Sequence, residues 1–357
     1  MYNQILVTGG AGFIGSNVSL HLLKVFPSAR VIAFDNLQRA GAQDSIAELQ
    51  ASGVTFVKGD TASKSQLASL GPVELIVDCA GEPAVTEGLD GTMTRLFNSN
   101  LYGALNCLEL AKKHNAGFIF LSSSRVYPVS RLNSISTIES GNRYSLLPEQ
   151  AQQGVSIKGI SEKFPLDGYR SIYGATKLST ELLIEEFSKA FEIPTIINRC
   201  SVISGPRQLG RAEQGFVTFW MASHFFGKPL EYRGFNGSGF QVRDILHVED
   251  LCSLIAMQSK DINRLSGSTF NTGGGAENSI SLLQLTDSCR EITGNHVEIS
   301  PKTITHMYDI SCYISDTTKV RSEVGWRPAR NLEHILVDIY YWIKENSSEL
   351  EELFFKC

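Results

Sequence analysis

The sequence predicts an α/β protein whose main part is a doubly wound parallel sheet of the Rossmann type, followed by a smaller C-terminal substrate-binding subdomain. Apolar runs alternate with helical stretches through the first half of the chain. The runs are continuous, as in a parallel sheet covered on both faces, and the first leads straight into closely spaced glycines. The expected strands are residues 4–7, 30–35, 54–57, 75–80, 117–121 and 193–198.

The first expected strand is followed by a glycine turn and then by a helix. The glycines recur at a spacing of three. Glycine accepts a positive φ and lets a pyrophosphate approach without a Cβ in the way, and a helix start offers free N–H groups to phosphates. Strand, turn and helix together predict dinucleotide binding through Gly9, Gly12, Phe13, Ile14 and Gly15.

An acidic residue closes the second strand. Asp35 stands ~20 residues beyond the glycines, where a carboxylate accepts hydrogen bonds from the ribose hydroxyls of the adenosine half. The same carboxylate repels a 2′-phosphate, so the expected cofactor is NAD rather than NADP. Asn36 is expected beside the cofactor as well. Arg39, four residues after Asp35, is interpreted as a solvated loop charge.

Ligands of a doubly wound sheet bind beyond the carboxyl ends of its strands. Asp60 lies at such an end after the third strand, and Ala80 and Gly81 lie at the end of the fourth. The fifth strand ends in three serines, 122–124. We therefore expect these residues to face the same ligand-binding region.

The regular alternation of expected strands and helices ends near Arg199, where longer Gly/Pro/Arg-rich loops begin. We expect residues 1–198 to form the NAD-binding domain and residues 199–357 mainly the substrate subdomain, with residues 268–271 returning to the main sheet. Residues 129–168 are long, polar and without clear periodicity, which predicts a functional or mobile loop.

A tyrosine and a lysine four residues apart begin the helix after that loop. Tyr173 and Lys177 share one helix face. An ammonium near a phenol favours the phenolate and lowers the phenol pKa, so Lys177 is expected to make Tyr173 a usable base. Lys177 can also hold a nicotinamide ribose. A serine at the end of the fifth strand would hydrogen-bond the same substrate hydroxyl.

These features together resemble the extended short-chain dehydrogenases/reductases of the nucleotide-sugar epimerase/dehydratase type, over essentially the whole chain. The resemblance rests on the motifs Gly9-x-x-Gly12-x-x-Gly15, Asp35-Asn36-Leu37, Gly59-Asp60, Asn100, Ser122-Ser-Ser-Arg-Val-Tyr127, Tyr173-x-x-x-Lys177, Gly205-Pro-Arg-Gln208, Val242-Arg-Asp244 and Val324-Gly-Trp-x-Pro328.

The resemblance implies roles for individual residues. Tyr173 is the expected base, Lys177 its partner and Ser123 the catalytic hydroxyl, with Ser124 as the alternative. Thr61 and Asn100 are expected to contact the cofactor. The substrate would be a nucleotide-diphosphate sugar, held by guanidinium groups that suit a diphosphate. The expected substrate-binding residues are Ser124, Arg207, Gln208 and Arg243.

Finer features resemble the CDP-paratose 2-epimerases (tyvelose epimerases): the stretches 34–42 and 241–247, and the long insertion before Tyr173. Glu82 stands where that family usually has an amide. The alternatives are a 4,6-dehydratase, a UDP-sugar 4-epimerase and a non-catalytic NAD-binding regulator. The resembling dehydratases carry Asp-Glu where this chain has Ser124-Arg125, and the retained Ser, Tyr and Lys argue against a silent protein.

Composition limits the partners. With 357 residues, a net charge of −5 and a pI near 5.9, the chain is not expected to bind nucleic acid or an anionic membrane. Seven cysteines without a C-x-x-C or zinc spacing predict reduced thiols and no metal site. The early first strand and the absence of long apolar runs predict a cytoplasmic protein. The resemblance to the epimerase/dehydratase family implies pairing of two helices per subunit into a homodimer or higher homo-oligomer.

Overall fold

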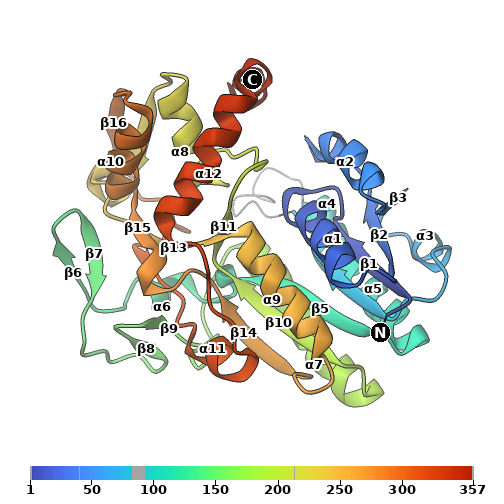
Figure 1. Ribbon diagram of the computed structural model, residues 1–357. Helices are drawn as coiled ribbons and strands as arrows, with labels where there is room; N and C mark the ends of the chain where they lie inside the picture. The colour runs from blue at the N-terminus through green and yellow to red at the C-terminus, as the bar shows by residue number, and fades with distance from the viewer. Residues whose placement is uncertain (1, 40, 83–92, 213, 356–357) are drawn as a thin grey trace.

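The computed structural model describes residues 2–39, 41–82, 93–212 and 214–355, and these contain a seven-stranded, all-parallel sheet (Figure 1). The strand order is β14-β10-β5-β4-β1-β2-β3. The predicted doubly wound sheet is therefore confirmed. Its strands are β1 Gln4–Thr8, β2 Arg30–Asp35, β3 Thr55–Lys58, β4 Leu75–Asp78, β5 Gly117–Ser123, β10 Thr195–Cys200 and β14 Ser268–Thr272.

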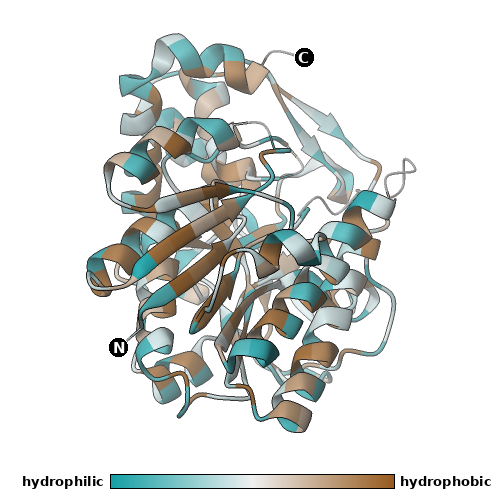
Figure 2. Cartoon of the chain, turned by 90° about the vertical axis from the view of Figure 1, so that its right-hand side faces the viewer, coloured by the Kyte–Doolittle hydropathy of each residue, from teal (hydrophilic) through white to brown (hydrophobic). Residues whose placement is uncertain are grey.

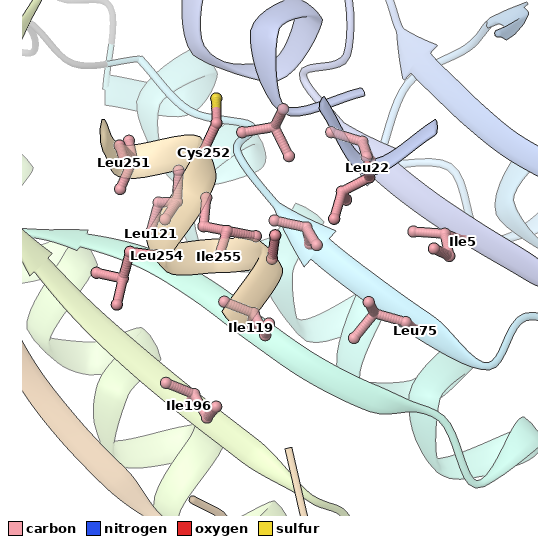
Figure 3. Packing of buried hydrophobic residues seen from close by; sticks show 14 of the residues in the cluster. Ile5, Leu22, Leu75, Ile119, Leu121, Ile196, Leu251, Cys252, Leu254 and Ile255 are labelled. Atoms are coloured by element: carbon pink, nitrogen blue, oxygen red, sulfur yellow. The ribbon is translucent and has the colours of Figure 1, made fainter. Parts of the chain in front are cut away.

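Helices cover both faces of this sheet. Along β1, Ile5 belongs to the apolar core on the face of α1 (Phe13–Val25) and α9 (Val248–Lys260), as Figure 3 shows. Its neighbour Leu6 belongs to the core on the face of α5 (Gly103–His114) and α7 (Ile172–Phe191). Because both faces are buried, successive strand residues are apolar, and the central strands are largely brown in Figure 2. Among the described residues, none of the helices could cross a membrane.

A second group of elements follows β10 and has its own apolar core. It contains the strands β11, β13, β15 and β17 in one sheet and the parallel pair β12–β16. The chain after β10 also contributes β14, α9 and α11 to the main sheet and its cover. Besides α9 and β14, the chain after β10 contains β11 Val202–Ser204, α8 Phe216–Phe225, β12 Leu230–Arg233, β13 Val242–His247, β15 Ser279–Ser281, α10 Leu282–Thr293, β16 Ile299–Lys302, β17 Cys312–Tyr313, α11 Thr318–Val324, α12 Leu332–Glu345 and α13 Ser347–Phe355.

Short helices connect the main strands. They are η1 Ala42–Ser45, α2 Ile46–Ala51, α3 Lys64–Ala68, α4 Met93–Phe97, the π-helical turn η2 Asn98–Tyr102 and η3 Ser124–Val126. The turn η2 runs directly into α5, and η3 follows directly on β5.

The stretch 129–168, predicted to be a loop, contains regular structure. It begins with α6 (Val129–Leu132) and forms two antiparallel hairpins, β6–β7 and β8–β9. These strands are only two to four residues long, too short to show a clear alternation in sequence. The strand bounds are β6 Thr137–Ser140, β7 Arg143–Leu146, β8 Val155–Ser156 and β9 Gly159–Ile160.

A buried ion pair joins α7 to the sheet. Glu181 of α7 and Arg199 of β10 are paired at 2.7 Å, with side chains 1% and 6% exposed. Ser122 of β5 donates to Glu181 at 2.5 Å, and Arg199 donates to the Tyr127 hydroxyl at 3.2 Å. Removing one partner of such a pair typically costs about 3–5 kcal/mol, because the other charge stays buried without compensation. The pair therefore fixes α7 against β5 and β10.

Candidate active site

A cavity of about 1640 Å³ lies over the carboxyl ends of β1, β2, β4, β5 and β10. Its wall continues into the second group of elements, through α8, β12 and residues 301–310. Pockets for a single small ligand are typically ~300–1,000 Å³, so this cavity has room for two ligands side by side. Of the sequence-predicted site residues, all except Asn100 line it.

The glycine turn shapes one end of the cavity. Gly9 has a φ of 59°, and a Cβ on Gly15 would collide with the Gly9 carbonyl oxygen. Gly12 caps α1 without a side-chain hydrogen bond, and the first α1 residues line the cavity. The free amides of the first turn and the positive end of the helix dipole therefore face the cavity. This arrangement fits a pyrophosphate.

Asp35 lies beside the glycine turn. Its carboxylate accepts hydrogen bonds from the Ala11 and Leu37 amides at 3.1 and 2.8 Å. Asn36 donates to Asp60 at 3.1 Å on the same side of the cavity. Each carboxylate oxygen of Asp35 retains acceptor capacity, so the residue can accept from ribose hydroxyls as predicted.

The Arg39 residue is exposed, as expected for a solvated loop charge, although its guanidinium loses some of its hydration to the cavity wall. Leu37, with a φ of 61°, turns the chain after β2, and Arg39 lines the cavity. Burial lowers the pKa of Arg39, while the charge of Glu82 and that of Tyr173 raise it. Glu82 in turn pairs with Arg95 at 2.5 Å. Arg39 thus lies close to the expected site of reaction.

The expected catalytic residues converge at the inner end of the cavity. Ser171 caps α7 by accepting from the Gly174 amide at 3.1 Å, which fixes the turn that carries Tyr173. Ser123 lies beside the Tyr173 phenol and lowers the pKa of that phenol. The Ser123 hydroxyl also accepts from the Arg125 amide at 3.2 Å. Of the two serines left open by the sequence, Ser123 is therefore the one in contact with Tyr173.

Lys177 is buried and has its own bonding partner at the end of β5. Lys177 donates to the Leu121 carbonyl at 2.9 Å, and its pKa is lowered by burial and raised by Asp78. Burial raises the pKa of Tyr173, and the groups that oppose this rise are Ser123, Arg125 and Arg39. The ammonium thus faces the β4–β5 side of the cavity, and the expectation that Lys177 activates the phenol stays a prediction.

Asn100 lies behind the cavity wall and not on it. Its side chain is 1% exposed, accepts from the Glu82 amide at 2.7 Å and donates to the Glu82 carbonyl at 3.1 Å. It also donates to Thr176 at 3.2 Å. The prediction of a direct cofactor contact is therefore corrected: Asn100 joins the end of β4 to α7. Asn100 belongs to the π-helical turn η2.

The predicted substrate residues Arg207 and Gln208 are bonded to neighbouring residues of the protein. Arg207, with a φ of 72°, pairs with Glu48 and donates to Asn17 at 2.6 Å, so it joins the loop after β11 to α1 and α2. The Gln208 amide is bonded to Ser204 and to the Ile203 carbonyl, both at 3.0 Å. Their substrate roles stay predictions.

Arg243 and Arg125 lie at the other side of the cavity. Arg243 donates to the Ile310 carbonyl and Arg125 to the Tyr308 carbonyl, at 2.7 and 2.9 Å. Ser124 lines the wall beside them. Sequence reasoning assigned no role to Arg125. The available signal was its position, one residue after the strand-end serines.

Fold and site together define an NAD-binding α/β enzyme with a Ser-Tyr-Lys set beside the cofactor pocket. The profile of the NAD dependent epimerase/dehydratase family matches residues 5–273. The chain belongs to this family, and its cofactor is NAD.

Relatives of several activities match nearly the whole chain. CDP-paratose 2-epimerase of Salmonella typhi is 29% identical, with 95% of this chain and 98% of the relative covered. dTDP-glucose 4,6-dehydratase of Salmonella typhimurium is 26% identical, with 96% and 93% covered. The crystal structure of dTDP-glucose 4,6-dehydratase from Bacillus anthracis in complex with NAD has a TM-score of 0.76 at 26% identity, with 98% and 99% covered.

Asp35 provides a direct test of the cofactor site. We expect Asp35→Asn to weaken NAD binding roughly 10- to 100-fold, because a hydrogen bond to a charged group is worth ~1.5–3 kcal/mol. Calorimetric titration with NAD measures this. Asp44→Asn is the matched control, since Asp44 lies on η1 outside the cavity wall, and it should leave the affinity unchanged. Equal affinities of both variants and the wild type would refute the assignment.

Proposed function

We propose that the protein is a nucleotide-sugar epimerase that inverts one sugar carbon by transient oxidation and re-reduction, acting on a CDP-sugar in the manner of a CDP-paratose 2-epimerase. The observation that carries this proposal is the contact of Ser123 with Tyr173, with Lys177 four residues along the same helix, at the inner end of a cavity large enough for cofactor and sugar nucleotide. The relative from Salmonella typhi supports the choice of CDP-sugar.

The residues would act as follows. Tyr173, as the phenolate, accepts the proton of the sugar hydroxyl, and the Ser123 hydroxyl donates a hydrogen bond to the same oxygen. Bound NAD supplies the chemistry of accepting a hydride from the sugar carbon and returning it. The keto sugar then presents its opposite face. Tyr173 returns the proton to the oxygen, so no proton or electron is lost over one turnover.

The cavity also suits an anionic substrate. Although the chain has a net charge of −5, Arg39, Arg125 and Arg243 line the cavity, and the first two act on Tyr173. Guanidinium groups recognise diphosphate oxygens in bidentate geometry. We therefore place the diphosphate toward Arg243 and the sugar toward Tyr173.

A 4,6-dehydratase is the second candidate, since such enzymes are among the relatives. Elimination needs an acid and a base beside the keto sugar. At the end of β5 the structure has Ser124 and Arg125, and Arg125 keeps a pKa of about 10 despite its burial. Neither side chain is a proton acceptor at neutral pH, which favours the epimerase.

The expected homodimer stays a prediction. Tyr102 at the start of α5 and Leu182 on α7 are 54% and 56% exposed, as an unpaired helix face would be. We propose that a second copy covers this face, and light scattering of the purified protein tests it: a monomer at micromolar concentration would contradict the proposal.

Tyr173 is the residue on which the proposed reaction depends. We expect Tyr173→Phe to fold and bind NAD normally and to lower turnover of the CDP-sugar by ~10²–10⁴-fold, because the proton acceptor is lost. The wild-type rate should rise with pH as the buried phenol ionises, and the variant should lose this rise. Chromatography of CDP-, UDP-, dTDP- and GDP-sugars after incubation gives the rates.

Tyr169→Phe is the matched control, since Tyr169 is exposed and lies outside the cavity wall; its activity should equal that of the wild type. Normal activity of Tyr173→Phe would contradict the assignment of Tyr173 as the proton acceptor. Loss of water from the sugar would favour the dehydratase.

A further inference from the structure

The loop after β11 joins the second group of elements to α1 and α2. Arg207 of this loop pairs with Glu48 of α2 and donates to Asn17 of α1 at 2.6 Å. Two residues further on, the Leu209 side chain packs against Gly41 so closely that a Cβ on Gly41 would lie 2.5 Å from the Leu209 Cδ1 atom. A polar and an apolar contact therefore hold this loop against α1, α2 and the segment that follows β2.

These contacts lie beside the part of the cavity that fits the adenosine half and the pyrophosphate of NAD. Asn17 also donates to the carbonyl of Phe13, the first residue of α1, at 2.7 Å. Gly41 and Arg207 line the cavity. Asn17 and Glu48 lie outside its wall. Arg207 therefore reaches from the cavity to two helices beside the glycine turn, and its partners there are groups of the protein.

The other end of the loop is fixed on β11. The Gln208 amide donates to the Ile203 carbonyl and accepts from Ser204, both at 3.0 Å. Arg207 has a φ of 72°, a left-handed conformation that is unfavourable for a residue with a Cβ. Such conformations persist where the surrounding contacts hold them. The loop is thus anchored at β11 on one side and at α1 and α2 on the other.

We propose that Arg207 controls the exchange of the cofactor: its contacts with Glu48 and Asn17, the Arg207 latch, close the adenosine side of the cavity and open before NAD enters or leaves. This inference goes beyond the proposed function and rests only on NAD as the cofactor. Because the latch consists of contacts within the protein, it opposes entry as well as exit. A residue that binds NAD would instead change the affinity and the dissociation rate together.

The rates of NAD exchange test the latch without any sugar. Dissociation is followed by chasing radiolabelled NAD with unlabelled NAD, and association by tryptophan fluorescence, since Trp220 lines the cavity. Glycine accepts the left-handed φ of position 207, so Arg207→Gly removes the side chain without straining the backbone. We expect this variant to raise both rates about tenfold and to change the affinity less than about threefold, because a charged hydrogen bond and an ion pair are lost together.

Glu48→Gln separates the latch from a direct contact with the cofactor. Glu48 lies outside the cavity wall and its side chain is 51% exposed, so the variant keeps both the fold and the cofactor site. We expect both rates to rise about two- to fivefold, as an exposed ion pair typically contributes. The double variant should exchange NAD no faster than Arg207→Gly, since the two residues form one contact.

Glu109→Gln is the matched control. It breaks the exposed pair of Lys64 and Glu109, which are 2.7 Å apart and lie outside the cavity wall. Both exchange rates of this variant should equal those of the wild type.

Unchanged rates in Glu48→Gln would overturn the proposal, also where Arg207→Gly does not fold. An affinity of Arg207→Gly weakened about tenfold with an unchanged association rate would overturn it as well, because that result assigns to Arg207 a direct contact with NAD. An active epimerase with unchanged exchange rates in both variants rejects the latch alone. Faster exchange in the variants of a protein that converts none of the sugars keeps the latch and rejects the epimerase.

Discussion

The site depends on how α7 is held against the carboxyl ends of β5 and β10. The buried pair of Glu181 and Arg199, with Ser122 bonded to it, crosses from the helix to both strands. Lys177 lies about one turn and Tyr173 about two turns further toward the start of α7, at distances fixed by helix geometry. A charge pair buried this deeply adds little net stability over an apolar contact. Its consequence here is to hold α7 in a position where the Tyr173 phenol lies beside Ser123 at the end of β5.

Electrostatics inside the cavity differ from those of the whole chain. The protein is acidic overall, yet Arg39 and Arg125 act on the phenol, while Glu82 faces Arg39 and Asp309 faces Arg125. Burial raises the pKa of Tyr173 and would by itself make it a poor base. Cations fixed in the wall oppose that cost, and they suit the anionic substrate as well. One arrangement of charge thus serves both binding and proton transfer.

Much of the fold and of the candidate site could be predicted from the sequence, because the residues that indicate them lie close together in the chain. The glycine turn, Asp35 and the Tyr173–Lys177 pair each follow from a fixed spacing on one element, and all of them line the cavity. Arg125 could not be assigned a role in this way. Its partner Tyr308 is 183 positions away, and only the fold brings the two together.

The positions of Arg39 and Asn100 relative to the cavity also depend on the local backbone. Leu37, in the left-handed region, precedes Arg39, which lines the cavity, and Asn100 is buried in the π-helical turn η2. Neither backbone feature has a strong residue signature at these positions. Residues 129–168 were predicted to be a loop because strands of two to four residues leave no periodic pattern.

The central claim is that a hydride leaves one sugar carbon and returns to the same carbon within one site. Epimerisation in D₂O tests this directly, with the product examined by proton NMR. The account predicts an inverted product without deuterium on any sugar carbon, because the hydride never exchanges with solvent. Deuterium at the inverted carbon would contradict it, since that outcome requires removal of a carbon-bound proton.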